Sequence, residues 1–180
     1  MDYQLSQSGT RLLAADLLPQ APIADRVVDE HESARAVRLL REAAAIAHAI
    51  AARSARQYFA ALRHHSPAFA AAALEHANEA RLHEQRIAAR IGELGGRPAQ
   101  PGTAAPRIPA EPREGDTLAA VIGGYLVAGR ATIESYRDIA LSMETCDRET
   151  QQLLEDIVAS EETRASALAG LLEETAAPAT

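Results

Sequence analysis

Four ionisable side chains recur at helical spacing within otherwise apolar stripes of the sequence. His76 and His83 lie on one such stripe, and Glu161 and Arg164 lie on another. Because residues three, four or seven positions apart share one face of a helix, we expect all four side chains to point into a core. Imidazole and carboxylate groups are ligands for iron, manganese and zinc, and a buried charge requires an opposite charge. This set therefore predicts either a metal site or a network of buried ion pairs.

The composition predicts that these stripes lie on helices. Hydrophobic residues make up 47% of the 180 residues, but nearly half of them are alanine, and only 3% of the chain is aromatic. Alanine is the strongest helix former, whereas sheets favour β-branched and aromatic residues, so we expect an all-α protein. No run approaches about 18 apolar residues, and the N-terminus lacks a basic region followed by an apolar stretch. We therefore expect no membrane span and no secretory signal.

Charge and cysteine content narrow the function classes further. All 18 basic residues are arginine, and 25 acidic residues give a formal net charge of −7. The arginines of the first half, including Arg53, are interleaved with acids, so we expect salt-bridged surfaces and no nucleic-acid partner. Cys146 is the single cysteine, which excludes an internal disulfide framework and fits a cytoplasmic location.

Proline and glycine divide the chain into four helical segments, with Ser66 and Asp116 as expected N-caps and Gly95 as a stop signal. The predicted helices span 29–65, 67–95, 116–144 and 148–174. They form one domain, 25–175, between an N-terminal extension, 1–24, and a frayed tail, 176–180. The connections are short, long and short, and the segment 96–115 is long enough to travel the length of a bundle. This pattern predicts two antiparallel helical hairpins joined by one long crossover, and the alternative is an up-and-down bundle.

The helical segments resemble those of a known family. Residues 73–83, followed by Ile87, Ile91 and the run Glu-Leu-Gly-Gly-Arg-Pro at 93–98, resemble the second helix of ferritin-like proteins, in particular bacterioferritins and Dps-like proteins. Residues 57–59 (Gln-Tyr-Phe) resemble a triplet of the first helix in that family, 130–136 the third helix and 153–172 the fourth. The resemblance covers about residues 40–172. It implies a ferritin-like four-helix bundle that self-associates and is connected with iron or oxidant handling.

The family's two iron or manganese ions are held by a Glu on the first and third helices and a Glu-x-x-His on the second and fourth. The resemblance places these six ligand positions, in chain order, at Ala51, Ala80, His83, Gly129, Glu161 and Arg164. Two of the six positions keep the expected residue type. Arg164 has no lone pair to donate, and at ~4 Å in an effective dielectric of ~20 it would repel a divalent ion by ~8 kcal/mol. The resemblance thus implies a degenerate dinuclear site and no diiron ferroxidase chemistry.

Three arrangements of the polar core remain open. In the first, no cofactor is bound, Arg164 pairs with Glu161 and with Glu79 across the bundle, and the histidines hydrogen-bond to tyrosine or glutamate. In the second, a mononuclear iron or manganese ion is held by His48, Glu79, His83 and Glu161. In the third, the small residues at the degenerate positions leave a pocket for an organic ligand, with Arg164 as its anion clamp.

These arrangements predict two functions. The first is a scaffold, a binding protein or a non-catalytic assembly partner, which forms a homo-oligomer or joins a paralogous ferritin-like subunit. The alternative is an iron-binding, oxidase or storage protein with a non-standard metal or ligand site in the bundle core. Self-association also follows from the extension 1–24, because its four leucines at 12, 13, 17 and 18 have no place inside a closed bundle and are expected to pack on a neighbouring subunit.

Overall fold

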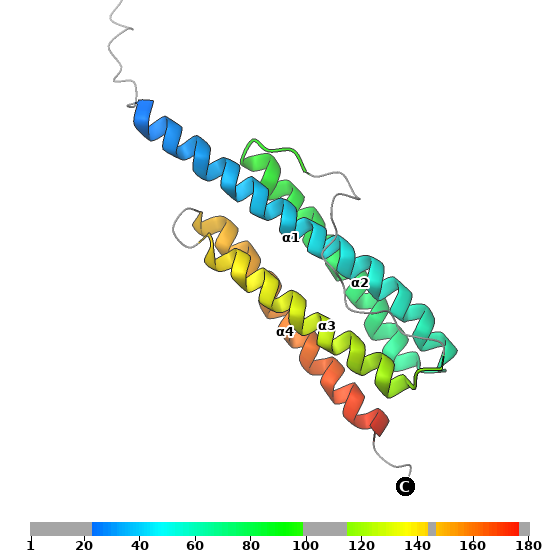
Figure 1. Ribbon diagram of the computed structural model, residues 1–180. Coiled ribbons are helices and arrows are strands. Elements are labelled where there is room, and N and C mark those ends of the chain that lie inside the picture. Colours follow the sequence, from blue (N-terminus) through cyan, green and yellow to red (C-terminus); the bar gives the residue numbers. More distant parts are fainter. Residues whose placement is uncertain (1–22, 99–114, 144–146, 177–180) are drawn as a thin grey trace, which may run out of the picture.

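The computed structural model describes residues 23–98, 115–143 and 147–176, and these residues contain four helices and no strand (Figure 1). The helices are α1 (Ile23–Arg63), α2 (Pro67–Glu93), α3 (Leu118–Leu141) and α4 (Arg148–Ala176). The all-α prediction is confirmed. The first helix begins earlier than predicted, at residue 23 instead of 29, because no proline or glycine interrupts the chain between Pro22 and Arg63.

Capping side chains set the start of α2 and the stop signal sets its end. Ser66 is the N-cap, as predicted, and its hydroxyl accepts a hydrogen bond from the backbone N–H of Phe69 at 3.4 Å. Pro67 occupies the first turn, where its missing N–H is not needed. Gly95 follows the helix with φ +73°, a conformation that glycine adopts without strain, and it ends α2 as predicted.

The predicted N-cap of α3 is wrong by one residue. Thr117 instead of Asp116 caps α3, because its hydroxyl accepts a hydrogen bond from the N–H of Ala120 at 3.2 Å. At the start of α4, the Asp147 carboxylate accepts from the N–H of Thr150 at 3.1 Å. Both contacts satisfy a backbone donor that a helix leaves free at its N-terminus.

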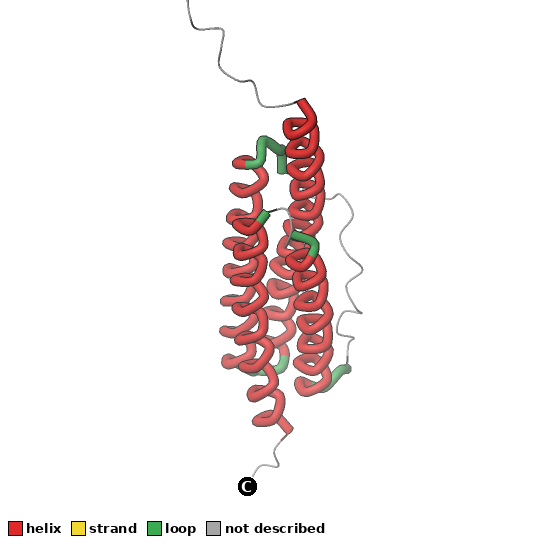
Figure 2. The backbone as a smooth tube through the Cα atoms, turned by 90° about the vertical axis from the view of Figure 1, so that its left-hand side faces the viewer, coloured by secondary structure: helices red, strands yellow, loops and turns green. Residues whose placement is uncertain are grey.

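The helices form two antiparallel hairpins, α1–α2 and α3–α4, that pack side by side (Figures 1 and 2). Gly96, just beyond α2, lies against Val37 of α1, whereas Val121 of α3 shares an apolar cluster with Ala61 and Phe69 at the opposite end of the bundle. Helices α2 and α3 therefore run in the same direction, and the chain between them must return along the bundle. This is the predicted crossover topology. Most of the crossover 96–115 and the extension 1–24 lie outside the described residues.

Helix α1 is much longer than its partner. It has 41 residues and α2 has 27, which correspond to about 61 Å and about 40 Å at a rise of ~1.5 Å per residue. Because α2 ends beside Val37, the first four turns of α1 project beyond the hairpin, as Figure 1 shows at the blue end.

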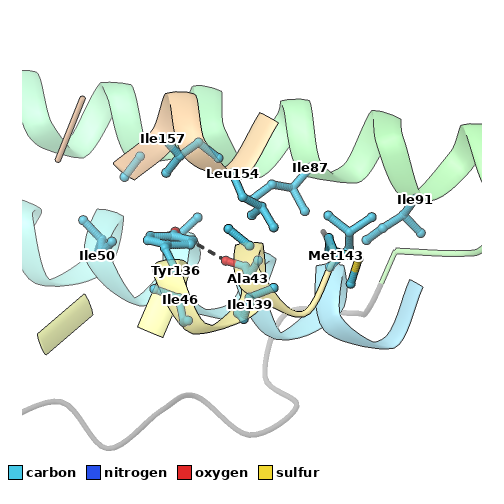
Figure 3. Packing of buried hydrophobic residues seen from close by; sticks show 14 of the residues in the cluster. Ala43, Ile46, Ile50, Ile87, Ile91, Tyr136, Ile139, Met143, Leu154 and Ile157 are labelled. Carbon is cyan, nitrogen blue, oxygen red and sulfur yellow. Dashed lines mark hydrogen bonds between the residues drawn. The ribbon is translucent and has the colours of Figure 1, made fainter. Parts of the chain in front are cut away.

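Two apolar clusters fill the bundle on either side of its middle. The larger cluster joins all four helices, and its tyrosine, Tyr136, points inward as expected and donates a hydrogen bond to the carbonyl of Ala43 at 3.4 Å (Figure 3). The smaller cluster surrounds Phe69 near the α1–α2 turn. Between the two clusters the inward positions of all four helices carry polar side chains, which identifies this level of the bundle as the place to look for function.

Candidate functional site in the bundle core

Each helix contributes one polar side chain to the level between the apolar clusters. The four residues, which we call the polar layer, are at most 4% exposed; they are Ser54 of α1, His76 of α2, Tyr125 of α3 and Glu161 of α4. The sequence predicted that His76, Tyr125 and Glu161 point inward, and this is confirmed. Buried polar groups of this kind require partners, and the layer supplies them internally.

The polar layer is one continuous chain of hydrogen bonds. His76 Nε2 lies 2.9 Å from Glu161 Oε2, His76 Nδ1 lies 2.6 Å from the Tyr125 hydroxyl, and that hydroxyl lies 2.5 Å from Ser54 Oγ. A carboxylate only accepts, so His76 Nε2–H donates to Glu161, and in a neutral imidazole Nδ1 then accepts from Tyr125. With a neutral His76 imidazole, every donor of this chain points toward the carboxylate. The expectation that histidine bonds to tyrosine and glutamate is confirmed for His76.

Burial keeps the Tyr125 hydroxyl protonated. It raises the pKa of Tyr125 well above its ordinary value; the hydrogen bond with Ser54 lowers the pKa in part, the charge of Glu161 raises it, and Arg53 has a smaller lowering effect. Arg53 is itself 6% exposed, donates to the carbonyl of Gly124 at 3.1 Å and lies 5.6 Å from the centre of the Tyr125 ring. The predicted surface position is therefore wrong for Arg53, which is buried at the edge of the polar layer.

His83 lies next to the polar layer without completing it. Its Nδ1 is 3.8 Å from Glu161 Oε1, and neither atom has a hydrogen-bond partner within the described part of the chain. Burial lowers the pKa of His83 below 6.5, helped by the positive charge of Arg86 and opposed by Glu161. His83 is therefore neutral near pH 7, and its Nδ1 and the Glu161 oxygen are two buried polar atoms that face one another across a short gap.

Arg164 does not pair with Glu161, and this part of the prediction is wrong. Its guanidinium forms an ion pair with Glu79 of α2, the expected second partner, and the other Glu79 oxygen accepts from Ser160 Oγ at 2.5 Å. Arg164 follows Glu161 by three residues, which is about 60° short of one full helical turn. Arg164 therefore lies at the edge of the α4 face that centres on Glu161. Its long side chain extends along that edge to Glu79, where the two side chains are 14% and 30% exposed.

The proposed four-ligand mononuclear site is not assembled. His48 lies on the surface and contacts Glu84 at 3.3 Å, while Glu79 is held by Ser160 and Arg164. Of the four expected ligands, the fold brings together only His83 and Glu161. Among residues 23–98, 115–143 and 147–176, no group of three or more His, Cys, Asp or Glu side chains is placed to hold a metal ion.

Three of the degenerate ligand positions hold small residues, of which Ala51 and Ala80 are buried and Gly129 is half-buried. Ala51 and Ala80 are 4% and 0% exposed, and a Cβ added at Gly129 would meet no atom within 4 Å. Space for a larger side chain therefore exists at Gly129. Arg164, which the ligand hypothesis requires as an anion clamp, is bound to Glu79.

Sequence reasoning missed the role of Ser54. The residue stands on the predicted inward stripe of the first helix, but its partner Tyr125 is 71 positions away in the chain. The available signal was a serine at an inward position among alanines, because a buried hydroxyl requires a partner.

None of the helices in the described ranges is both long and apolar enough to cross a membrane.

The crossover topology and the polar layer in the core define the class of this protein as a ferritin-like four-helix bundle. The chain belongs to the ferritin-like domain family, whose model matches residues 43–177. It is similar to a Mycobacterium smegmatis Dps1 mutant, with 17% identity over 79% of this chain and 97% of that one and a TM-score of 0.74.

Two further solved structures have the same fold. A Desulfovibrio desulfuricans bacterioferritin with a diiron site is 20% identical over 81% of this chain and 82% of that one, with a TM-score of 0.70. A dodecameric thioferritin, the bacterioferritin-related protein of Bacteroides fragilis, is 21% identical over 86% and 95%, with a TM-score of 0.68. No curated protein matches this sequence. At these identities the structures share the fold with this chain.

Proposed function

We propose that this chain is a ferritin-like assembly or binding protein in which the polar layer replaces a dinuclear metal centre. The observation that carries the proposal is the hydrogen bond of 2.9 Å between Glu161 and His76. Glu161 is the one carboxylate at the six matched ligand positions, and one of its oxygens is already held by a histidine outside that set.

The residues present do not fit a dinuclear iron or manganese centre. Two divalent ions bring four positive charges, and the matched positions offer one carboxylate, one neutral imidazole and one guanidinium against them. The three other carboxylate positions hold residues without a donor atom, namely Ala51, Ala80 and Gly129. The donor set therefore supports a non-catalytic role, in a homo-oligomer or with a paralogous ferritin-like subunit, linked to iron or oxidant handling.

Restoring the ligands tests this proposal directly. The variant Ala51→Glu/Ala80→Glu/Gly129→Glu/Arg164→His supplies the full family ligand set, and the space beside Gly129 admits the new side chain. The matched control places glutamine at positions 51, 80 and 129 together with Arg164→His, which keeps the volume and removes the carboxylates.

We expect wild-type protein and the glutamine control to oxidise Fe(II) no faster than buffer and to hold fewer than two metal ions per chain. We expect the glutamate variant to gain thermal stability when Mn(II) or Fe(II) is added, because the metal relieves repulsion among buried carboxylates. Two iron or manganese ions per wild-type chain, bound through His83 and Glu161, would overturn the proposal.

The gap between His83 and Glu161 favours a second candidate, an iron-binding role for a single ion. The two unpartnered atoms are 3.8 Å apart, which allows both to lie ~2.1 Å from one ion between them. Metal analysis of His83→Ala against wild type separates the candidates. One ion per wild-type chain that is lost in the variant would support a mononuclear site.

A further inference from the structure

An exposed aromatic side chain stands between two arginines on the outer surface of α1. Phe59 is 60% exposed, and Arg56 and Arg63 are exposed one turn before and one turn after it. We call these three residues the α1 knob. Its surroundings along α1 are basic, because the acids expected among these arginines lie mostly before Arg35, and the stretch from Arg35 to Arg63 contains six arginines and one acidic residue, Glu42. An exposed large aromatic ring among cations is the composition of an interaction surface.

A groove lies between α3 and α4. Its volume is about 340 Å³, and Leu141 beside it is 66% exposed. Four apolar and two acidic residues line it; these are Ala140, Leu141, Val158 and Ala159, and Glu155 and Glu162. Arg137 and Gln151 complete the lining, and Arg137 forms an ion pair with Glu162.

The knob and the groove carry opposite charges at the same spacing. Arg56 and Arg63 are seven residues apart with Phe59 between them, and Glu155 and Glu162 are seven residues apart with Val158 between them. Seven helical residues rise ~10.5 Å, so both charge pairs span the same length of helix surface.

The net charges of the two hairpins agree with this match. Helices α1 and α2 hold ten basic and nine acidic residues, a formal charge of +1. Helices α3 and α4 hold four basic and nine acidic residues, a formal charge of −5. Opposite charge on the two hairpins favours contact between the α1–α2 side of one copy and the α3–α4 side of another.

We propose that Phe59 of one copy inserts into the α3–α4 groove of a second copy, with Arg56 and Arg63 against Glu155 and Glu162. Each copy then offers one knob and one groove, which makes the contact heterologous, so that successive copies close a ring or extend a chain. The inference rests on the self-association that is part of the proposed function, and it specifies which surfaces associate.

A charge exchange between two variants tests the contact. Arg56→Glu/Arg63→Glu reverses the knob, and Glu155→Arg/Glu162→Arg reverses the groove. The matched control is Glu173→Arg/Glu174→Arg, which changes the charge of α4 equally at exposed positions outside the groove. Phe59→Ala removes the ring without changing charge. Helicity and thermal melting establish that each variant folds, and sedimentation velocity and light scattering measure the mass over a range of concentrations.

We expect each reversed variant alone, and Phe59→Ala, to associate roughly tenfold or more weakly than wild type, whereas the control associates normally. Mixing the two reversed variants should restore the wild-type association constant, because each reversed knob then meets an oppositely charged groove. Loss of association that mixing does not restore, or an unchanged constant in Phe59→Ala, would refute the contact. If the wild-type chain stays monomeric at about 100 µM, both the contact and the proposed assembly role are refuted. If the chain forms an oligomer that none of the variants changes, only this contact is refuted.

Discussion

Replacing His76 by leucine should destabilise this protein more than removing any surface ion pair. The imidazole donates to Glu161 at 2.9 Å, and the two side chains are 5% and 3% exposed. His76→Leu leaves a buried carboxylate with neither oxygen bonded, because the other oxygen already has no partner among the described residues. Breaking a buried pair from one side typically costs ~3–5 kcal/mol. In a chain of this size ~1 kcal/mol shifts the melting temperature by roughly 2–4 °C, so we expect a loss of about 6–20 °C.

The double variant His76→Leu/Glu161→Leu separates the lost hydrogen bond from the stranded charge. Replacing both members by apolar residues removes the charge, so the double variant should be more stable than His76→Leu alone. Arg164→Ala is the comparison at the edge of the site, where the partly exposed pair with Glu79 is worth at most ~1 kcal/mol. Urea unfolding at pH 7 and fixed protein concentration measures all three. A double variant less stable than His76→Leu, or a loss in Arg164→Ala that equals that of His76→Leu, would refute the reasoning.

Three further outcomes follow from other contacts. Because the pKa of His83 is lowered in the folded protein, the unfolded chain protonates this imidazole more readily, and the stability is fully present above pH 6.5 and falls below it. His83→Gln should therefore reduce the pH dependence of the unfolding free energy between about pH 7 and 5. Gly96→Ala would place a Cβ 2.7 Å from a methyl group of Val37 and should cost ~1–3 kcal/mol in a thermal melt, less in a chain that also carries Val37→Ala. Arg90→Ala should cost ~1–3 kcal/mol in urea unfolding, since Arg90 of α2 donates to Asp147, just before α4, at 3.0 Å, and Arg90→Lys should recover only part of this stability.

The inward direction of the site residues was predictable from the sequence, because a periodic stripe assigns each residue to a face of its helix. The stripes placed His76, Tyr125 and Glu161 in the core, and the structure confirms this. The same stripes could not choose the partner of Arg164. That choice depends on a rotation of about 60° within α4 and on which neighbouring helix lies at the edge, and neither quantity is encoded in a single helix.

The N-cap of α3 and the partner of Ser54 could not be predicted from local sequence either. Asp116 and Thr117 are adjacent and both can cap a helix, so propensity alone does not separate them, whereas the hydrogen bond to Ala120 does. The Ser54–Tyr125 contact depends on how far one hairpin is shifted along the other. Local sequence contains no information on that shift. A family resemblance indicates where metal ligands would lie, but it does not identify the residues, such as Ser54 and Tyr125, that form hydrogen bonds in this core instead.

Every hydrogen bond of the polar layer joins one hairpin to the other. Ser54 and His76 belong to the first hairpin, Tyr125 and Glu161 belong to the second, and no bond of the layer stays within a hairpin. Each hairpin is built from contacts close in sequence, so we expect the two hairpins to form first and to dock afterwards. Docking one helical turn out of alignment would leave these four groups buried without partners at ~1–3 kcal/mol each, so the layer selects the correct alignment during folding.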